Sequence, residues 1–525
     1  MRAREYSPLP MAQLTSAENR ERGIVHNCGI AGVYNPRGDV AGVIEKLLAS
    51  LNHRGQEGAG VVIVGENEDL LAKGKGLVKE VIDNKHDEPV SPAVVSLTQL
   101  RAHKGKIAIG QDRYSTAGTL DAWQPFYDKQ ARFGLVHNGN FTNVDKMLAL
   151  VPPKKRKDAV SDSWVAHQAI LAAKGDSWEE KIKTAVSQFE GAYSLIMQSD
   201  KKLFALRDPW GMRPLCVGML PDGGYVVASE PNGFASLGAV FLQELKPGQG
   251  VVIDETGMHE FWQDERAQEV NQAFCSFEYV YIAKPNSFIE GRSVSAIRER
   301  LGANLARKDR ESGVDMSNAV VVGVQDSGVA YASAYAHEAQ VPMVLGLVKN
   351  NYSVNGRVFM QNDGREAATL LKHEVDPFLI EGKDVYLVDD SIVRGITMVK
   401  IIHELKNAGK AYGLKGPRSI HVRIASPRIT DPCFFGVDFS TRTELANDHG
   451  AIDPVEEIRK LIGADSLRFT STHELVGAIT NTAIDPSASQ EQVFCEHGLC
   501  GHCFTGILPL PVRREGLMRK KPAAS

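Results

Sequence analysis

The sequence predicts two successive domains: a layered α+β domain, then an α/β domain with a parallel, doubly wound sheet. In residues 28–265, many short apolar runs are separated by turn signals, as in layered strand-rich domains. From about residue 276 the pattern becomes apolar strand, polar loop and amphipathic helix, which is typical of a parallel sheet. The chain has 525 residues, a length that accommodates two to four domains with substantial cores.

Composition narrows the class of protein. With 43% hydrophobic and 24% charged residues, the chain is close to the average for globular proteins. A net charge of -4 gives no basic field for nucleic acid. No apolar run reaches 18 residues, and the first 27 residues lack the apolar core of a secretory signal. We therefore expect a cytoplasmic protein with neither a nucleic-acid nor a membrane partner.

Strands and helices of the first domain follow from its apolar spacing. Strands are expected at 30–34, 60–64, 107–110, 134–137, 192–197, 225–228 and 250–253. Segments 43–51 and 164–173 have helical spacing. We expect these helices to cover mixed or antiparallel strands, and the domain to end near residue 265.

The second domain, residues 266–465, contains a loop suited to an anion. Apolar residues 385–388 precede Asp389 and Asp390, and a helix with Ile401 and Leu405 on its apolar face follows. At the carboxyl end of a parallel strand, loop amides and the helix N-terminus can bind phosphate. The two carboxylates can hold sugar hydroxyls or hydrated magnesium. The pattern favours a phosphorylated ribose, and the alternative is an acidic turn that caps a helix.

Seven cysteines in a chain of this size, without a signal sequence, do not indicate a disulfide framework. Cys500 and Cys503 form a C-x-x-C pair, a spacing that lets two thiolates bind one metal ion or cluster. Two free thiols are the alternative for this pair. The pair lies in a C-terminal segment, residues 466–525, which ends in a basic tail.

The stretch VDDSIVRGIT, residues 388–397, resembles the phosphoribosyl pyrophosphate (PRPP) loop of type I phosphoribosyltransferases. More specifically, the chain resembles the glutamine PRPP amidotransferases, or amidophosphoribosyltransferases, from residue 28 to about 508. Their other motifs occur in order: Asn27-Cys28-Gly29-Ile30-Ala31-Gly32, His53-Arg54-Gly55-Gln56-Glu57, Arg113-Tyr114-Ser115-Thr116, His137-Asn138-Gly139-Asn140, Ser161-Asp162, Arg207-Asp208-Pro209, Arg213-Pro214-Leu215, Ala228-Ser229-Glu230 and Glu278-Tyr279-Val280-Tyr281. The resemblance implies an N-terminal-nucleophile glutaminase domain with α-β-β-α layers, followed by a type I phosphoribosyltransferase domain.

For the first domain, the resemblance implies that residues 1–27 are a propeptide and that Cys28 becomes the N-terminal residue. Its α-amine, with an ordinary pKa near 8, then accepts the thiol proton. The thiolate attacks the glutamine side-chain amide, and ammonia and glutamate leave through a thioester intermediate.

Five further residues of this domain receive roles from the same resemblance. The side-chain amide of Asn138 and the backbone N–H of Gly139 hold the oxyanion. Arg113 pairs with the α-carboxylate of glutamine and Asp162 with its α-ammonium group. Arg54 is placed among the substrate-binding residues.

The resemblance assigns the second domain to PRPP. Asp389, Asp390 and Ser327 form the ribose, pyrophosphate and magnesium environment. The loop for the 5-phosphate comprises Ser391, Arg394, Gly395 and Thr397. A mobile loop that closes over PRPP carries Lys349, Tyr352 and Arg357. Ammonia then displaces pyrophosphate from C1 of PRPP to give 5-phosphoribosylamine, the first committed step of purine biosynthesis.

The resemblance also implies a cofactor and partners. Iron-sulfur members carry four cysteine ligands, and the matching residues here are Cys275, Cys433, Cys500 and Cys503, a set that suits a 4Fe-4S cluster. A zinc site is the alternative, with ligands from Cys495, Cys500, Cys503 and either His497 or His502. Purine nucleotides are implied as feedback inhibitors, and a homo-oligomer, tetramer or dimer, as the assembly.

A few positions depart from the family pattern. Gln111-Asp112 replaces a His-Val pair, and we expect strand alternation to aim Asp112 away from the glutamine site. Gln325 replaces a proline, Ile396 a threonine and Asn351 an arginine. The last two changes predict altered PRPP affinity or loop timing.

Two other functions compete with the enzyme. One is a PRPP- or nucleotide-sensing paralogue that has lost turnover, although the residues assigned to catalysis are all present. The other is a different glutamine amidotransferase with the same first domain, which the VDDSIVRGIT stretch argues against. The enzyme is therefore the favoured function.

Overall fold

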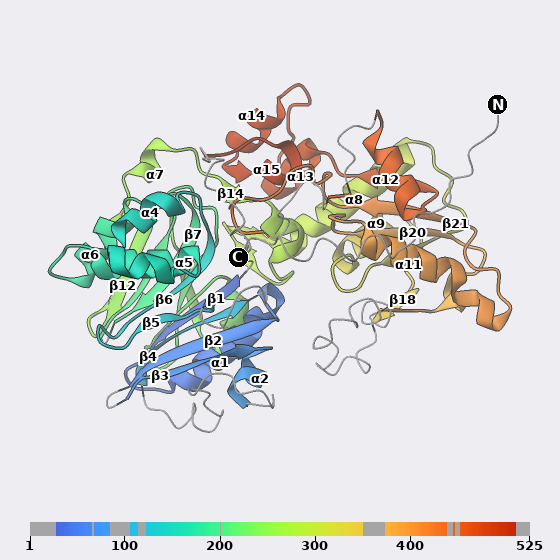
Figure 1. Ribbon diagram of the computed structural model, residues 1–525. Coiled ribbons are helices and arrows are strands. Elements are labelled where there is room, and N and C mark those ends of the chain that lie inside the picture. Colours follow the sequence, from blue (N-terminus) through green and yellow to red (C-terminus); the bar gives the residue numbers. More distant parts are fainter. Residues whose placement is uncertain are drawn as a thin grey trace, which may run out of the picture.

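The computed structural model describes residues 28–65, 68–83, 105–113, 122–199, 201–349, 373–437, 445–446 and 452–510. Two α/β bodies lie side by side, and the C-terminal helices α13 to α15 lie between them (Figure 1). No helix within the described ranges is long and apolar enough to cross a membrane.

Two antiparallel sheets form the N-terminal domain. The first has the order β11-β9-β10-β1-β4-β2-β3 and the second the order β13-β12-β8-β7-β6-β5. The strands of the first sheet are β1 (Cys28–Tyr34), β2 (Gly58–Gly65), β3 (Leu70–Lys75), β4 (Gly105–Arg113), β9 (Cys216–Met219), β10 (Tyr225–Ala228) and β11 (Val240–Glu244). Those of the second are β5 (Phe126–Asp128), β6 (Phe133–Phe141), β7 (Gly191–Gln198), β8 (Leu203–Arg207), β12 (Gln249–Asp254) and β13 (Gly257–Gln263).

Helices cover the outer faces of both sheets (Figure 1). The helices of this domain are α1 (Val40–Leu51), α2 (Val78–Asp83), α4 (Val144–Leu150), α5 (Asp162–Ala172) and α6 (Trp178–Val186), with short turns η2 (Asn52–Arg54), η4 (Pro153–Asp158), η5 (Pro231–Gly233) and η6 (Ala235–Leu237). Helix α7 (Arg266–Glu269), just past the predicted boundary at 265, also packs here, since Arg266 donates to the carbonyl oxygens of Phe189 and Val186. An apolar layer that includes Ile109, Val136 and Ile196 fills the space between the sheets. The α-β-β-α layering confirms the predicted fold class of this domain.

The second domain has a parallel sheet of order β17-β20-β21-β22. One face packs with α8 and α9 and the other with α11 and α12, as the two apolar clusters show. The bounds are α8 (Val294–Glu311), β17 (Ala319–Gly323), α9 (Val329–Ala339), β20 (Asp384–Asp389), α11 (Ile396–Asn407), β21 (Ser419–Ile424), α12 (Pro454–Ile462) and β22 (Ser466–Phe469). Smaller elements are β15 (Phe288–Ile289), β16 (Arg292–Ser293), β18 (Leu347–Lys349), β19 (His373–Val375), η9 (Pro377–Leu379) and η10 (Ala408–Tyr412). The predicted parallel α/β domain is thereby confirmed.

The C-terminal segment returns to the junction between the domains. It contains α13 (Thr472–Thr480), α14 (Gln490–Cys495), β23 (Leu499–Cys500) and α15 (His502–Thr505). Strand β23 pairs in parallel with β14 (Phe274–Cys275), which leads into the π-helical turn η7 (Glu278–Ile282). Strand β23 is therefore fixed to the connection between the domains.

Candidate active site

Strand pairing places Cys28 beside Arg113. Cys28 begins β1, is fully buried, and lies opposite Arg113 in the β1–β4 register. Arg113 Nη1 donates to the carbonyl oxygen of Ala122 at 3.0 Å, and its guanidinium carbon lies 5.7 Å from the Trp123 ring centroid. Burial lowers the pKa of Arg113, while the charges of Cys28, Asp162 and Glu57 act to raise it. The nucleophile and both residues predicted to bind the glutamine backbone groups therefore share one site.

Residues 138–140 of β6, the oxyanion strand, carry the predicted oxyanion donors. Asn138 is 1% exposed, and its side-chain nitrogen and oxygen have no hydrogen-bond partner among the described residues. Gly139 has φ +136°, and a Cβ there would lie 2.0 Å from the carbonyl oxygen of Ala192. Only glycine fits this position. A buried amide without a partner is suited to receive a developing negative charge.

Asp162 is fixed at the start of α5. Its Oδ1 accepts a hydrogen bond from the Ser163 amide at 2.7 Å, and its Oδ2 accepts one from the Phe141 amide at 3.3 Å. The position also favours a carboxylate, because helix N-termini attract negative charge. The ring nitrogen Nδ1 of His137 lies 2.9 Å from Ser163 Oγ, and burial lowers the pKa of His137. A neutral imidazole thus borders the site.

Asp112 lies on the other face of β4 from Arg113. Along this strand Ile107 and Ile109 belong to the layer between the sheets, whereas Ala108 belongs to the cluster under α1. Alternation places Asp112 with Ala108, in agreement with the expectation from the sequence. Both carboxylate oxygens are buried without a partner among the described residues, and burial raises the pKa of Asp112 well above its ordinary value.

The second group of predicted site residues lies at the carboxyl ends of β17 and β20. Ser327 Oγ donates to Asp389 Oδ1 at 2.8 Å, and the Asp390 amide donates to the same oxygen at 2.9 Å. Burial raises the pKa of both aspartates, and the charge of Asp390 raises that of Asp389 further. Oxygen ligands are those magnesium prefers, and a divalent cation would relieve the repulsion of two buried carboxylates, so this donor set fits magnesium.

The predicted phosphate loop leads directly into α11. Gly395 precedes this helix with φ +74°, a left-handed conformation, and provides no side-chain cap. The N–H groups of the first turn therefore remain available to an anion. Thr397 is exposed on this turn, Arg394 is half-buried, and Ser391 Oγ donates to Asp390 Oδ2 at 2.5 Å.

Lys349, at the end of β18, forms an ion pair of 2.5 Å with Asp326. Both side chains are more than a third exposed, so this pair can open to a ligand at little cost. Tyr352, Arg357 and Asn351, also assigned to the mobile loop, lie outside the described residues.

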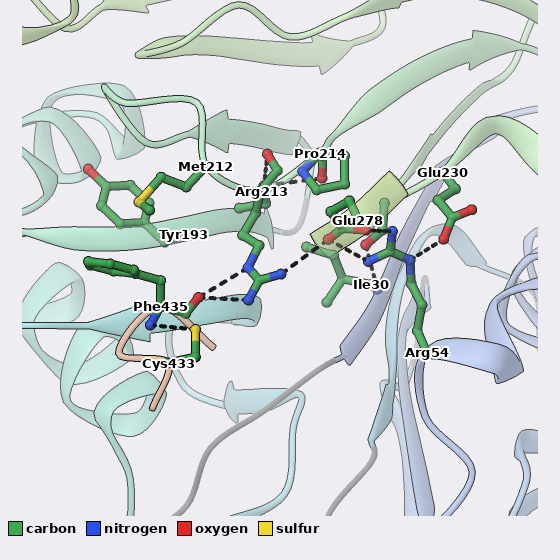
Figure 2. A network of polar contacts seen from close by, with 12 residues as sticks. Ile30, Arg54, Tyr193, Met212, Arg213, Pro214, Glu230, Glu278, Cys433 and Phe435 are labelled. Atoms are coloured by element: carbon green, nitrogen blue, oxygen red, sulfur yellow. Dashed lines mark hydrogen bonds and ion pairs between the residues drawn. The ribbon is translucent and has the colours of Figure 1, made fainter. Parts of the chain in front are cut away.

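Arg54, predicted to bind substrate, is 1% exposed and engaged by two carboxylates. Its Nη2 lies 2.6 Å from Glu278 Oε2, and its Nε contacts Glu230 (Figure 2). Although burial acts to raise the pKa of Glu230, the charge of Arg54 holds it well below the ordinary value. Glu278 also accepts from Arg213 Nη1 at 3.1 Å. Arg54 therefore ties the N-terminal domain to η7.

The four predicted cluster cysteines converge on one small cavity. The cavity is lined by Met212, Arg213, Cys275, Phe277, Cys433, Phe435, Val437, Cys500, His502 and Cys503. Cys495, a ligand in the zinc alternative, does not line it. Burial raises the pKa of Cys275 to about 12 and that of Cys500 and Cys503 well above the ordinary value.

Four sulfur donors among apolar groups, with the Arg213 guanidinium and the His502 imidazole beside them, fit an iron-sulfur cluster, whose ligands are thiolates. None of the seven cysteines, all of which are described, forms a disulfide. Within the described part of the chain, no three His, Cys, Asp or Glu side chains are grouped to hold a single metal ion.

Some residues around these sites received no role from the sequence. The Trp123 ring lies over the Arg113 guanidinium. Arg213 and Glu278 form a buried ion pair, and although both residues occur in the family motifs, neither was assigned a role. A charged residue inside an otherwise apolar run is a signal for a buried ion pair. The contact of Gly436 with Gly139 joins two domains and has no local signature in the sequence.

Comparisons with known proteins agree with this geometry. A glutamine amidotransferase domain model matches residues 111–236, and a phosphoribosyl transferase domain model matches residues 293–422. Amidophosphoribosyltransferase of Bacillus subtilis (strain 168) is 35% identical over 507 residues, covering 95% of this chain and 97% of that protein. A chloroplastic amidophosphoribosyltransferase of Glycine max is 34% identical, covering 98% and 84%, respectively.

Solved structures give the same result at the level of the fold. Glutamine PRPP amidotransferase from B. subtilis, complexed with ADP and GMP, matches with a TM-score of 0.76 and 35% identity, over 93% of this chain and 98% of that one. A structure described as the allosteric regulatory enzyme of purine biosynthesis matches with a TM-score of 0.76 and 34% identity, over 93% and 97%.

Proposed function

The chain belongs to the amidophosphoribosyltransferase family, and we propose from this premise that Cys28 releases ammonia from glutamine for use at the Asp389–Asp390 site. The enzyme converts PRPP, glutamine and water to 5-phosphoribosylamine, glutamate and pyrophosphate in purine biosynthesis. One arrangement supports the assignment of roles most directly. Cys28 lies opposite Arg113 in the β1–β4 register, and the charge of Asp162 acts on Arg113.

In the glutaminase half-reaction, removal of residues 1–27 exposes the α-amine of Cys28 as the base. The amine takes the thiol proton, the sulfur attacks the glutamine amide carbon, and Asn138 and Gly139 stabilise the oxyanion. The α-ammonium group of Cys28 returns this proton to the amide nitrogen, which leaves as ammonia, and water then hydrolyses the thioester to glutamate. Arg113 and Asp162 hold the α-carboxylate and α-ammonium groups throughout.

In the phosphoribosyl half-reaction, Asp389 and Asp390 orient the ribose hydroxyls, and the first turn of α11 binds the 5-phosphate. Ammonia attacks C1 as the bond to pyrophosphate breaks, and the amine then loses a proton. Ser327, Asp389 and Asp390 would hold a magnesium ion, which would supply positive charge beside the departing pyrophosphate. Lys349 supplies a further positive charge once its ion pair with Asp326 opens.

We further propose that Cys275, Cys433, Cys500 and Cys503 hold a 4Fe-4S cluster. Protein purified without oxygen is expected to contain about four iron and about four acid-labile sulfide per chain. Cys433→Ser should lose both, whereas Cys495→Ser, whose side chain lies outside the cavity, should keep them. Stoichiometric zinc that is lost in Cys495→Ser would instead establish the zinc alternative.

Regulation, assembly and location are extensions of the family assignment. We propose feedback inhibition by purine nucleotides, in keeping with the ADP and GMP in the B. subtilis structure. We also propose that the protein forms a homo-oligomer, either a tetramer or a dimer, and that it is located in the cytoplasm. Cysteines without disulfides are in keeping with a reducing compartment.

A coupled assay tests the enzyme. Anaerobically purified, N-terminally processed protein receives glutamine and magnesium, with or without PRPP, and glutamate and pyrophosphate are measured. Equal yields that depend on PRPP are expected. Glutamate without pyrophosphate would show that the second domain is uncoupled, and neither product would favour the sensing paralogue.

Two variants assign the half-reactions to their sites. Cys28→Ala should lower glutamine-dependent turnover by at least about 10³-fold, yet still release pyrophosphate when ammonium replaces glutamine. Asp390→Asn should lose pyrophosphate release with either nitrogen source. If Cys28→Ala retains glutamine-dependent turnover, the assignment of the nucleophile is wrong.

A further inference from the structure

Residues 433–437 of the second domain, here the cysteine loop, lie directly against the oxyanion strand. Asn140 Nδ2 donates to the carbonyl oxygen of Phe434 at 2.8 Å, across 294 positions of sequence. Gly436 has φ +104°, and a Cβ there would lie 2.9 Å from the carbonyl carbon of Gly139 and 3.0 Å from its Cα. The two backbones therefore touch at the residue assigned to the oxyanion.

Arg213 also holds the cysteine loop. Its Nε and Nη2 donate to the carbonyl oxygen of Phe435 at 3.1 and 2.8 Å, and its Nη1 reaches Glu278 at 3.1 Å (Figure 2). The side chain is 1% exposed. A Cβ on Gly436 would also lie 3.0 Å from Arg213 Nη2. The loop is thus bonded to a fixed guanidinium and lies against the oxyanion strand, and Gly436 has no room for a side chain beside either one.

The same loop carries a predicted cluster ligand. The Phe435 amide donates to Cys433 Sγ at 3.3 Å, and both residues line the cysteine cavity. Phe435 packs in an apolar cluster with Ala192, Met212 and Cys500. The carbonyl oxygen of Ala192, on the neighbouring strand β7, is also the atom that leaves no room for a side chain at Gly139. Packing from two directions therefore determines where the Gly139 backbone lies.

An oxyanion hole works only when its donors are fixed before the charge develops, because reorientation during the reaction consumes the stabilisation. We propose that the cysteine loop is the back wall of this hole, with Gly436 and Arg213 as positioning residues that hold Gly139 for glutamine hydrolysis. The inference rests on the proposed role of Gly139. It makes the rate of the first domain's reaction dependent on a segment of the second domain.

Gly436→Ala tests the wall directly, because the added methyl group displaces Gly139 and the positive φ adds strain. We expect kcat for glutamine hydrolysis to fall about tenfold or more, given that loss of one oxyanion donor costs about 10²–10³-fold. KM for glutamine should change less than about twofold, because Arg113 and Asp162 are untouched. Pyrophosphate release with ammonium and PRPP should also stay within about twofold.

Gly382→Ala is the matched control. It places alanine at φ +65° in the same domain, where nothing lies within 4 Å of the new Cβ. This variant carries comparable backbone strain without contact with the oxyanion strand, so its glutamine kcat should equal that of the wild type. An equal loss of kcat in Gly382→Ala would overturn the proposal.

Asn140→Ala and Arg213→Lys keep the test decisive if Gly436→Ala does not fold. Asn140→Ala removes only the bond to the Phe434 carbonyl, and Arg213→Lys removes the paired donors to Phe435 while keeping the charge beside Glu278. Both should lower glutamine kcat while ammonium-dependent turnover persists. Folded variants with unchanged glutamine kcat, or with both activities lowered equally, would overturn the inference. Wild-type protein without glutaminase activity would instead overturn the proposed function itself.

Discussion

At the scale of single residues, Asp112 places a carboxyl group where neither water nor a described partner reaches it. Burial raises its pKa in the folded chain, so the folded state binds a proton that the unfolded state releases above about pH 4. The contribution of Asp112 to stability is therefore greatest below that pH and falls as pH rises toward the folded-state pKa. The side chain of Asp112→Asn cannot titrate. Over this pH range, the free energy of unfolding of the variant should therefore rise relative to that of the wild type by up to about 1.4 kcal/mol per pH unit.

Urea midpoints measured from pH 5 to pH 8 test this expectation. Asp158→Asn provides the control, since Asp158 is an exposed carboxylate on η4. Its difference from the wild type should not vary with pH. A constant difference for Asp112→Asn as well would mean that Asp112 is ionised in the fold.

At the scale of elements, the phosphate loop depends on one left-handed residue before α11. Gly395→Ala keeps φ at +74° only with strain of about 1–2 kcal/mol, although its Cβ meets no close neighbour. We expect KM for PRPP to rise about 5–30-fold, with the glutamine KM unchanged. Gly413→Ala, at φ +72° in a surface turn, should leave both values unchanged, so a shared loss would argue against a role in binding PRPP.

Elements with continuous apolar runs were accessible from the sequence, because each such strand is buried on both faces. This applies to β1, β2 and β7, and also to β20 before the phosphate loop. Strand β3 alternates with lysines, and β11 is an exposed edge strand, so neither produces that signal. The prediction captured the layers. It omitted the edge strands β3, β5, β11 and β13, and also the inner strands β8 and β9.

The residues of the candidate site also fall into two groups, those that the sequence could identify and those that it could not. Cys28, Asn138, Gly139 and Asp162 lie within short motifs, and the family resemblance that those motifs carry assigned their roles. The partners of Arg54 are different, because Glu230 and Glu278 lie 176 and 224 positions away. Many charged residues in the chain are equally plausible partners, and only the folded packing determines which ones meet.

At the scale of the whole molecule, Glu278 connects the two domains through Arg54 and Arg213. All three side chains are at most 1% exposed. Glu278→Gln removes the carboxylate that Arg54 and Arg213 share, and leaves Arg54 with Glu230 alone. Breaking a buried ion pair from one side costs about 3–5 kcal/mol, so the urea midpoint should fall substantially. Salt should not reduce this difference, since buried pairs are poorly screened.

Glu190→Gln is the matched control for this loss. It removes an exposed ion pair with Lys146, at 3.1 Å, on the surface of the first domain. Such pairs contribute about 0–1 kcal/mol, and added salt weakens them. If both variants lose similar stability, the buried network contributes no more than a surface pair.

The pairing of β14 with β23 also determines when the junction can form during synthesis. Ser276, next to β14, donates to the carbonyl oxygen of Cys500, 224 positions later. At about 5–20 residues per second, the ribosome needs about 10–45 s to produce that stretch. The N-terminal domain therefore emerges well before the strand that fixes the junction, and its face toward the second domain stays uncovered for that interval. A chain interrupted before Cys500 lacks this attachment, however complete its first domain is.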